Sequence, residues 1–347
     1  MGVGNVSPGR ARQQPVRAAS TDVARLAGVS QKTVSRVMNN EPYVRDEVRD
    51  RVLRAATQLG YRPNGAARSL LSGRSRRLGV ISLGTRLYGP MTMLVAIERS
   101  ARRLGYAVSV AHTSEDDQHG VADAIEGLLE QGVDGIVVAE AIDEGQITVT
   151  VDVPVLTIGR FPGLVAARRI RSAEKSDRSG SVATRHLIEL GHTEIRHIAG
   201  PPRWWASRDR ADSWRAALLE ASLPVVEPVA GDWSCESGYR AGLQLAEDRA
   251  MTAVFVANDD MAIGLIRALQ DAGRQVPGDV SVIGMDDIPS ARFLRPALTT
   301  IAQDFDAVAT EGVGLLAAEI SEPGAVERTL HEVDPPLIVR ESTAASG

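Results

Sequence analysis

Polar and aromatic side chains gather at the ends of several predicted strands and in the loops after them. They are Arg210, Trp233, Asn258, Asp286 and Gln303, with Phe305 close by. A sugar has apolar C–H faces and a polar rim, so an aromatic ring beside acidic, amide and guanidinium groups suits it. Plainer interpretations place Trp233 in a core, Arg210 in a surface ion pair and Asp286–Asp287 in a turn. Their joint placement favours a site for a small polar ligand.

Catalytic and metal-binding motifs are missing from the sequence. It contains no GxSxG nucleophile elbow, no P-loop and no HExxH. His186 and His192 lie six residues apart and would not share a helix face, and with His197 they lack the paired spacing of a metal site. His192 fits a helix–strand turn better. We expect no enzyme, no metal and no cofactor.

The segment Ser20–Asn39 predicts two helices around a turn. Apolar residues return on one face of each helix, at Val23, Ala24, Ala27, Val34 and Val37. Gly28 suits a left-handed turn, and Ser30 suits the N-cap of the second helix. This spacing is typical of a DNA-binding helix-turn-helix. We expect a third helix over Asp46–Leu59 to close a small core with Val48, Val52, Leu53 and Ala56.

The second helix of this pair would present a polar face. Its outward residues are Gln31, Lys32, Thr33, Ser35 and Arg36. Gln can read adenine and Arg or Lys can read guanine in the major groove, while Ser and Thr can contact phosphates. An ordinary helical hairpin with a solvated face is the alternative.

Charge is divided unevenly along the chain. Residues 1–77 hold 15 Arg and Lys against 5 Asp and Glu, whereas the remainder holds 24 basic and 39 acidic residues. A basic head of net +10 on a body of net −15 suits binding to a polyanion, although a solvated basic tail would look the same.

From Leu78 onward, apolar runs alternate with amphipathic stretches. Strands are expected at 78–83, 106–111, 134–139, 154–158, 194–200, 224–230, 252–258 and 279–287. Helices are expected near 90–104, 121–131, 180–190, 208–221, 237–247 and 260–272. Such alternation predicts parallel sheets covered by helices on both faces. Since it runs twice, we expect two similar lobes with a ligand in the cleft between them.

Motifs along the chain resemble the lac repressor and gal repressor family. TDVARLAGVSQKTVSRVMN at 21–39 and GYRPNGAARSLLSG at 60–73 resemble its head and hinge. HLIELGH at 186–192, VFVANDDMAIG at 254–264, SVIGMDDIP at 281–289 and LTTIAQDF at 298–305 resemble its body. The resemblance covers essentially residues 20–340.

The resemblance implies an all-α helix-turn-helix head and an α/β body of two doubly wound parallel-sheet lobes, like a periplasmic binding protein. We expect a disordered arm over 1–18, the DNA-binding domain over 19–63, and a hinge helix and linker over 64–77. An effector-binding and dimerisation domain would fill 78–347. Its N-lobe would take about 78–174 and 304–333, and its C-lobe about 175–303 and 334–347.

The family's hinge becomes helical on DNA, and its Leu, here Leu70, wedges into the minor groove. Ala66 and Ala67 would let two hinge helices approach closely, and Arg68 could contact a phosphate. A flexible linker is the alternative. The DNA contacts implied for this chain are Thr21, Ser30, Gln31, Lys32, Thr33, Ser35, Arg36, Asn39, Tyr43, Tyr61, Asn64, Ala67, Arg68 and Leu70.

For the body, the family's effector-binding Arg and Asp match Arg210 and Asp286. The full implied set is Tyr88, Pro90, Arg160, Arg210, Trp233, Asn258, Asp286, Gln303 and Phe305. Gly159 departs from the pattern, because the family's namesake has an acidic sugar contact there. A disaccharide or glycoside is the first expectation, since Trp233 offers a large apolar contact.

The predicted function is a repressor released from pseudo-palindromic operator DNA by a bound sugar. A corepressor-dependent regulator and, more distantly, a sugar-binding receptor are the alternatives. The first residues lack the apolar core of a secretory signal, and no apolar run approaches the ~18 residues that cross a bilayer. We therefore expect a cytoplasmic protein with no membrane partner. The extra tetramerising helix of the family's namesake is missing after PPLIVRESTAASG, so we expect a homodimer.

Overall fold

The computed structural model describes two compact units, Met1–Ser75 and Arg76–Gly347. The described residues are 18–38, 41–61, 73–116, 120–139, 142–145, 149–159, 161, 164, 169–172, 176–324 and 335–347. Six predicted site residues fall outside them: Asn39, Asn64, Ala67, Arg68, Leu70 and Arg160. Within the described residues, no helix is long and apolar enough to cross a membrane.

The first unit, here called the head, contains three helices. They are α1 (Ser20–Ala27), α2 (Gln31–Met38) and α3 (Asp46–Gln58). Gly28 ends α1 with φ 64° and ψ 40°, a left-handed conformation that glycine adopts without steric cost. The Ser30 hydroxyl accepts the Thr33 N–H at 3.1 Å and so caps α2. The predicted turn and cap are both confirmed.

The head core contains the residues expected from α1 and α2, but α3 contributes a different set. Val52, Ala55 and Ala56 are buried, whereas Leu53 is 45% exposed and Val48 is only half-buried. The prediction that Leu53 closes the core was wrong. One residue advances a helix by about 100°, so the side chain after Val52 points away from the face that Val52 buries. Ala55 occupies that face instead.

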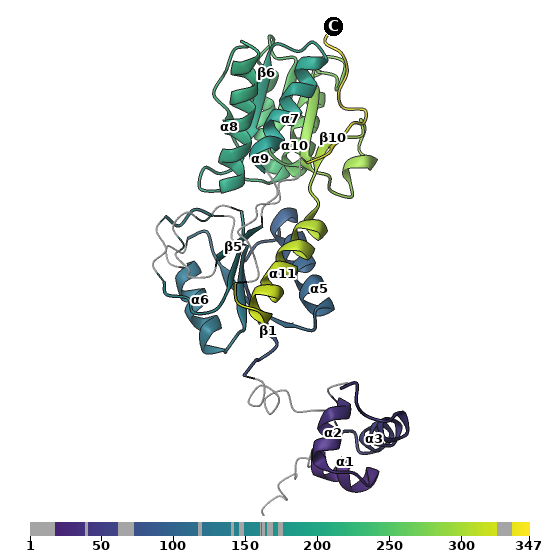
Figure 1. The fold of residues 1–347 in the computed structure, drawn as a ribbon. Coiled ribbons are helices and arrows are strands. Elements are labelled where there is room, and N and C mark those ends of the chain that lie inside the picture. The colour runs from purple at the N-terminus through teal and green to yellow at the C-terminus, as the bar shows by residue number, and fades with distance from the viewer. Residues whose placement is uncertain are drawn as a thin grey trace, which may run out of the picture. The chain divides into compact units, whose positions relative to one another are not determined.

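The second unit begins with a parallel sheet and the helices that cover it, which together we call the first lobe (Figure 1). Its strand order is β2-β1-β3-β4-β5. The strands are β1 (Arg77–Leu83), β2 (Ala107–Thr113), β3 (Gly135–Ala139), β4 (Val155–Ile158) and β5 (Arg169–Ser172). Two helices, α5 (Tyr88–Arg103) and α11 (Phe305–Ser321), pack on one face, and α6 (Gly120–Glu130) packs on the other.

The second lobe holds six strands in the order β11-β10-β9-β8-β6-β7. They are β6 (Ile195–Ala199), β7 (Val229–Ala230), β8 (Ala253–Val256), β9 (Ser281–Asp286), β10 (Thr299–Ala302) and the antiparallel β11 (Leu337–Ile338). Helices α7 (Ser176–Glu189) and α8 (Trp205–Glu220) cover one face, and α9 (Cys235–Ala246) and α10 (Asp259–Asp271) cover the other. A short 3-10 helix, η1, spans Ala291–Phe293.

The alternation of side chains along one strand shows how the second sheet packs between its two layers of helices. In β8, Val254 and Val256 pack against α9 and α10, while Ala253 and Phe255 pack against α7 and α8. A strand buried on both faces reads as a continuous apolar run, which is why it could be recognised in the sequence.

Several elements differ from the expected pattern. The expected strand at 224–230 is reduced to Val229–Ala230, because Pro224 and Pro228 lack the N–H that a ladder requires. The expected strands and helices also did not include β5, which is short and polar, nor η1, β10 and β11. Helix α11, which carries the chain back to the first lobe after β10, was not among the expected helices either. Strand β11 then returns it to the second lobe beside β10.

Candidate functional site

The outer face of α2 is polar and open to solvent. Gln31, Lys32, Ser35 and Arg36 are exposed, as predicted, while Val34 and Val37 are buried on the opposite face. Thr33 is half-buried, and its hydroxyl lies 2.9 Å from that of Ser30. An exposed row of amide, ammonium and guanidinium groups on the second helix of a helix-turn-helix is what base reading in the major groove requires.

Other predicted DNA contacts of the head are distributed around α2. Thr21 is exposed at the start of α1, and Tyr43 is almost fully exposed before α3. Tyr61 differs, because it is half-buried against the head core. The Gln31 amide nitrogen donates to the Ser20 hydroxyl at 2.8 Å, which ties the start of α2 to α1.

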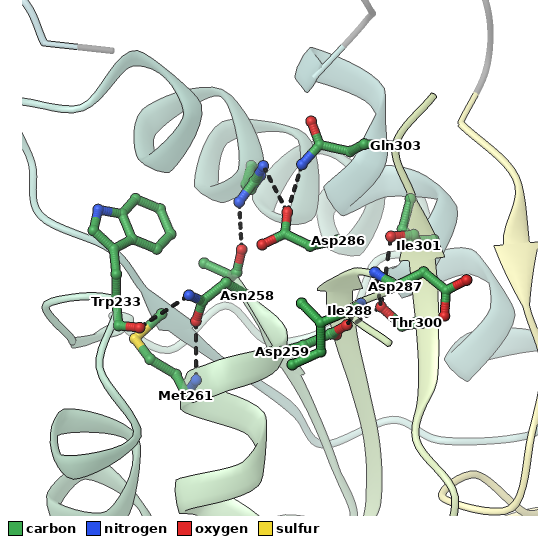
Figure 2. A network of polar contacts seen from close by, with 12 residues as sticks. Trp233, Asn258, Asp259, Met261, Asp286, Asp287, Ile288, Thr300, Ile301 and Gln303 are labelled. Atoms are coloured by element: carbon green, nitrogen blue, oxygen red, sulfur yellow. Dashed lines mark hydrogen bonds and ion pairs between the residues drawn. The ribbon is translucent and has the colours of Figure 1, made fainter. Parts of the chain in front are cut away.

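The second group of predicted residues gathers at the carboxyl edge of the second sheet. Strand order reverses between β6 and β8, and a parallel sheet binds ligands beside such a reversal. Trp233, Asn258, Asp286 and Gln303 follow or end the strands β7, β8, β9 and β10. Figure 2 shows them converging with their hydrogen bonds. We call them, with Arg210, the Asp286 cluster.

Asp286 is the charged centre of this cluster. Its Oδ1 accepts a hydrogen bond from the Gln303 amide at 2.5 Å and lies 3.8 Å from a guanidinium nitrogen of Arg210. Burial raises the pKa of the Asp286 carboxyl to about 6, although Arg210 and Gln303 lower it. Its backbone has φ 115°, and Asp287 follows with φ 50°. Backbone strain of this kind concentrates at functional sites.

Arg210 is an interior side chain and is only 5% exposed. The alternative of a surface ion pair is therefore wrong. One guanidinium nitrogen donates to the Ala257 carbonyl at 2.5 Å, and the group lies 5.7 Å from the centre of the Trp233 ring. The guanidinium is thus fixed between an acid and an aromatic face, and Coulomb interactions are strong where water is excluded.

Trp233 belongs both to the core and to the cluster. It is 4% exposed, and its ring lies 5.3 Å from that of Trp204. Gly200, which follows β6, makes room for it, because a Cβ there would lie 2.2 Å from a ring carbon. Among the described residues the Trp233 Nε1–H has no hydrogen-bond partner. The residue has φ 72°, which an L side chain rarely adopts.

Asn258 joins two elements of the site. Its Oδ1 caps α10 by accepting the Met261 N–H at 3.0 Å, and its Nδ2 donates to the Trp233 carbonyl at 3.0 Å (Figure 2). Sequence reasoning gave no role to the next residue, Asp259, which is fully buried. It accepts the Ile288 N–H and the Thr300 hydroxyl, so it fixes the loop after β9. Burial and the Asp286 charge raise its pKa well above the ordinary value.

The first lobe contributes an aromatic pair. Tyr88 begins α5 and meets Phe305, at the start of α11, with ring centres 6.2 Å apart. Burial and, to a lesser extent, the charges of Asp286, Asp287 and Asp259 raise the Tyr88 pKa against the hydrogen bond to Thr92. Tyr88 therefore lies within the electric field of the Asp286 cluster. Pro90 is half-buried in the first turn of the same helix.

The three neighbouring histidines have structural contacts, and that of His186 is with the Thr343 hydroxyl, 3.4 Å from its Nε2. His192, in the turn between α7 and β6, has Nε2 3.0 Å from the Ser281 hydroxyl and from the Ala344 carbonyl. His197 lies fully buried between the rings of Trp214 and Phe255. In the part of the chain that the structure describes, no group of three or more His, Cys, Asp or Glu residues could hold a metal ion.

Comparisons with known proteins agree with this architecture. Residues 21–64 match bacterial regulatory proteins of the lacI family, and residues 184–343 match a periplasmic binding protein-like domain. The lactose operon repressor of Escherichia coli K12 is 33% identical over 93% of this chain and 89% of its own length. The repressor PurR of Vibrio campbellii is 33% identical over 92% of this chain and 97% of its own. A lac repressor dimer bound to operator and the anti-inducer ONPF superposes with a TM-score of 0.81 and 29% identity, covering 94% and 99%.

A helix-turn-helix head joined to a two-lobed α/β body with a polar cluster at its strand ends is typical of a DNA-binding transcription regulator. The chain belongs to the lacI family of bacterial regulatory proteins and is a DNA-binding transcriptional repressor.

Proposed function

We propose that the chain is a homodimeric repressor that binds a pseudo-palindromic operator through α2 and is released by a sugar bound at the Asp286 cluster. The contacts of Asp286 carry this proposal. A buried carboxylate, an amide and a guanidinium lie together beside an indole face. The carboxylate, the amide and the guanidinium suit the hydroxyl groups of a sugar, and the indole suits the apolar face of its ring. The proposal assigns no catalytic activity to the chain.

The charge of Asp286 supports a hydroxyl-rich ligand. An ionised carboxylate is costly to bury, which is why its pKa is raised. A ligand hydroxyl that donates to it would offset part of that cost at neutral pH. Trp233 supplies the wide apolar contact that favours a disaccharide or glycoside.

The second candidate is a corepressor mechanism with a purine. PurR and the lactose operon repressor have the same identity to this chain, so the two relatives favour neither effector class. The two effector classes can be distinguished by experiment because they differ chemically: a purine is flat and aromatic and presents few hydroxyl groups, unlike a sugar.

The operator and the dimer rest on the superposed lac repressor dimer and on the exposed face of α2. A two-fold dimer places two recognition helices on two half-sites, so the operator would be a pseudo-palindrome. The hinge contacts Asn64, Ala67, Arg68 and Leu70, and those of Asn39 and Arg160, are part of the proposal through the family alone.

One experiment separates the candidates. An operator is selected from random duplex DNA with the purified full chain, and its binding is followed by fluorescence anisotropy. A panel of monosaccharides, disaccharides, aryl glycosides and purine bases is then added. Release by a sugar, lost in Trp233→Ala, would support the proposal. Tighter binding with a purine base would replace it with the corepressor mechanism.

A further inference from the structure

We infer that Glu41 is a specificity-determining residue, which positions Arg36 to read a base and weakens binding to DNA in general. The inference rests on the proposed function, since it requires α2 to be the helix that reads DNA. It starts from an ion pair on the polar face of the head. Glu41 Oε2 lies 3.6 Å from Arg36 Nε.

The backbone of Glu41 is held at two points. Its N–H donates to the Arg36 carbonyl at 3.0 Å, which attaches it to the last turn of α2. Its carbonyl accepts a hydrogen bond from the Arg49 guanidinium, on α3, at 2.7 Å. The carboxylate is therefore presented to Arg36 from a fixed backbone rather than from a free loop.

The pair leaves the other end of the guanidinium available. Glu41 approaches the Nε edge, whereas the two terminal nitrogens form the fork that can donate to O6 and N7 of guanine. Both side chains are about half exposed, at 48% and 46%, so the pair lies at the surface of the head. A carboxylate on one edge restricts the rotamers of a long side chain and so favours one direction of approach.

The charge of Glu41 has a second effect. Phosphates attract the head on any sequence, and a carboxylate near the binding face repels them equally on every sequence. The favourable effect on Arg36 operates only where the right base is present. Since specificity is a difference between two affinities, a residue that lowers both but lowers the non-specific one more increases discrimination.

Glu41→Gln is the test, because it keeps the size and removes the charge. Affinities of the full chain for its selected operator and for a random duplex of equal length are measured over a salt series. We expect the random duplex to bind several-fold tighter and the ratio of the two affinities to fall about five- to tenfold. Asp50→Asn is the matched control: it removes one exposed charge from α3, and both affinities should rise by the same factor.

A double-mutant cycle shows whether Glu41 acts through Arg36. In an Arg36→Ala background, Glu41→Gln should change the affinity ratio by less than about twofold, since coupled residues are not additive. Base preference is also measured at every operator position. Glu41→Gln should weaken this preference at one base pair only, the same one that Arg36→Ala affects.

Three outcomes would overturn the inference while leaving the proposed function intact. The first is an unchanged ratio of operator to random-duplex affinity in Glu41→Gln. The second is an equal fall of this ratio when Glu41→Gln is made in the Arg36→Ala background. The third is loss of folding in Glu41→Gln, seen by circular dichroism, which would make Glu41 a structural residue. A wild-type chain without preference for any DNA sequence would overturn the proposed function and this inference together.

Discussion

Arg208 of the second lobe donates to Asp143 of the first lobe, with 2.8 Å between Nη2 and Oδ2. The contact is part of a short seam between the lobes. The Asp143 N–H donates to the Arg203 carbonyl at 2.9 Å, and Ile142 forms an isolated β-bridge with Trp204. Because the Trp204 ring also touches Trp233, the seam adjoins the Asp286 cluster.

The Asp143–Arg208 pair should make a measurable but small contribution to stability. A double-mutant cycle with Asp143→Asn and Arg208→Gln should give a coupling free energy of roughly 0.5–1 kcal/mol in urea unfolding, because the side chains are 25% and 39% exposed and partly screened. Burial raises the pKa of Asp143, but hydrogen bonds from Arg208 and Gly145 outweigh it and hold the pKa below 3.8. The coupling should therefore persist at pH 7 and be lost only as pH falls through this lowered pKa. A coupling that weakens already above pH 5 would contradict the assignment.

Asp286 should make the unfolding free energy depend on pH. Its pKa is raised from 3.8 to about 6, so the folded chain binds a proton between these values that the unfolded chain releases. Stability from this residue is present at low pH and is lost as pH rises through about 6. Relative to Asp286→Asn, the wild type should gain about 2 kcal/mol on going from pH 7 to pH 4. Urea unfolding of both proteins without ligand would measure this difference, and parallel pH profiles would refute it.

His197 should act in the opposite direction. Burial lowers its pKa from 6.5 to about 4, against the hydrogen bond that its Nδ1 makes with the Phe255 carbonyl. Its stabilising effect is complete above pH 6.5 and is lost as pH falls towards 4. His197→Phe, which keeps a ring between Trp214 and Phe255, should remove about 3 kcal/mol of this acid sensitivity. If acid unfolds the variant and the wild type equally, another residue is responsible.

Gly200→Ala should damage the ligand site. The new methyl group would lie 2.2 Å from the Trp233 ring, so the ring must shift, at a typical overpacking cost of about 1–3 kcal/mol. We expect a changed tryptophan emission and weaker binding of the releasing sugar. Gly127→Ala in α6 is the control, since a Cβ there has no neighbour within 4 Å. Equal behaviour of the two variants would show that Trp233 does not depend on Gly200.

Gln31→Ala should distinguish base reading from a structural link. If Gln31 reads a base, the operator affinity falls by about 1–3 kcal/mol while random DNA is bound almost as before. Ser20→Ala removes the partner of the Gln31 amide and leaves the amide free to contact DNA, so it should retain operator affinity. Loss of operator binding in both variants would indicate that the Ser20–Gln31 bond holds α1 and α2 together.

The elements that sequence reasoning predicted well are those fixed by local chemistry. Gly28 and Ser30 determine the turn and the cap of the helix-turn-helix within a few residues. Continuous apolar runs identify the buried strands. The segment Arg169–Ser172 gave no such signal, because its residues alternate and include two arginines. Helix α11 is rich in small and apolar residues on all sides, so it lacks a clear amphipathic stripe.

The residues of the Asp286 cluster were named from the sequence, but the contacts that surround them were not. Side chains that follow parallel strands must meet at one edge, and this rule brought Asn258, Asp286 and Gln303 together. The Asp143–Arg208 pair joins residues 65 positions apart on different lobes, and no local pattern indicates such a contact. Asp259 was visible in the motif after β8, but its role depends on Thr300, which only the sheet brings near.

The return of α11 to the first lobe affects how the body can be made on the ribosome. Synthesis through Ser172 supplies all five strands of the first sheet, yet the face that α11 covers stays open until residues beyond Phe305 have emerged. The second sheet waits in turn for β11 and for Ser342, whose carbonyl and hydroxyl bond to β9 and β10. Neither lobe can complete its core before the other is nearly finished. The nascent body must therefore keep apolar surface exposed for most of its translation, while the head is free to fold early.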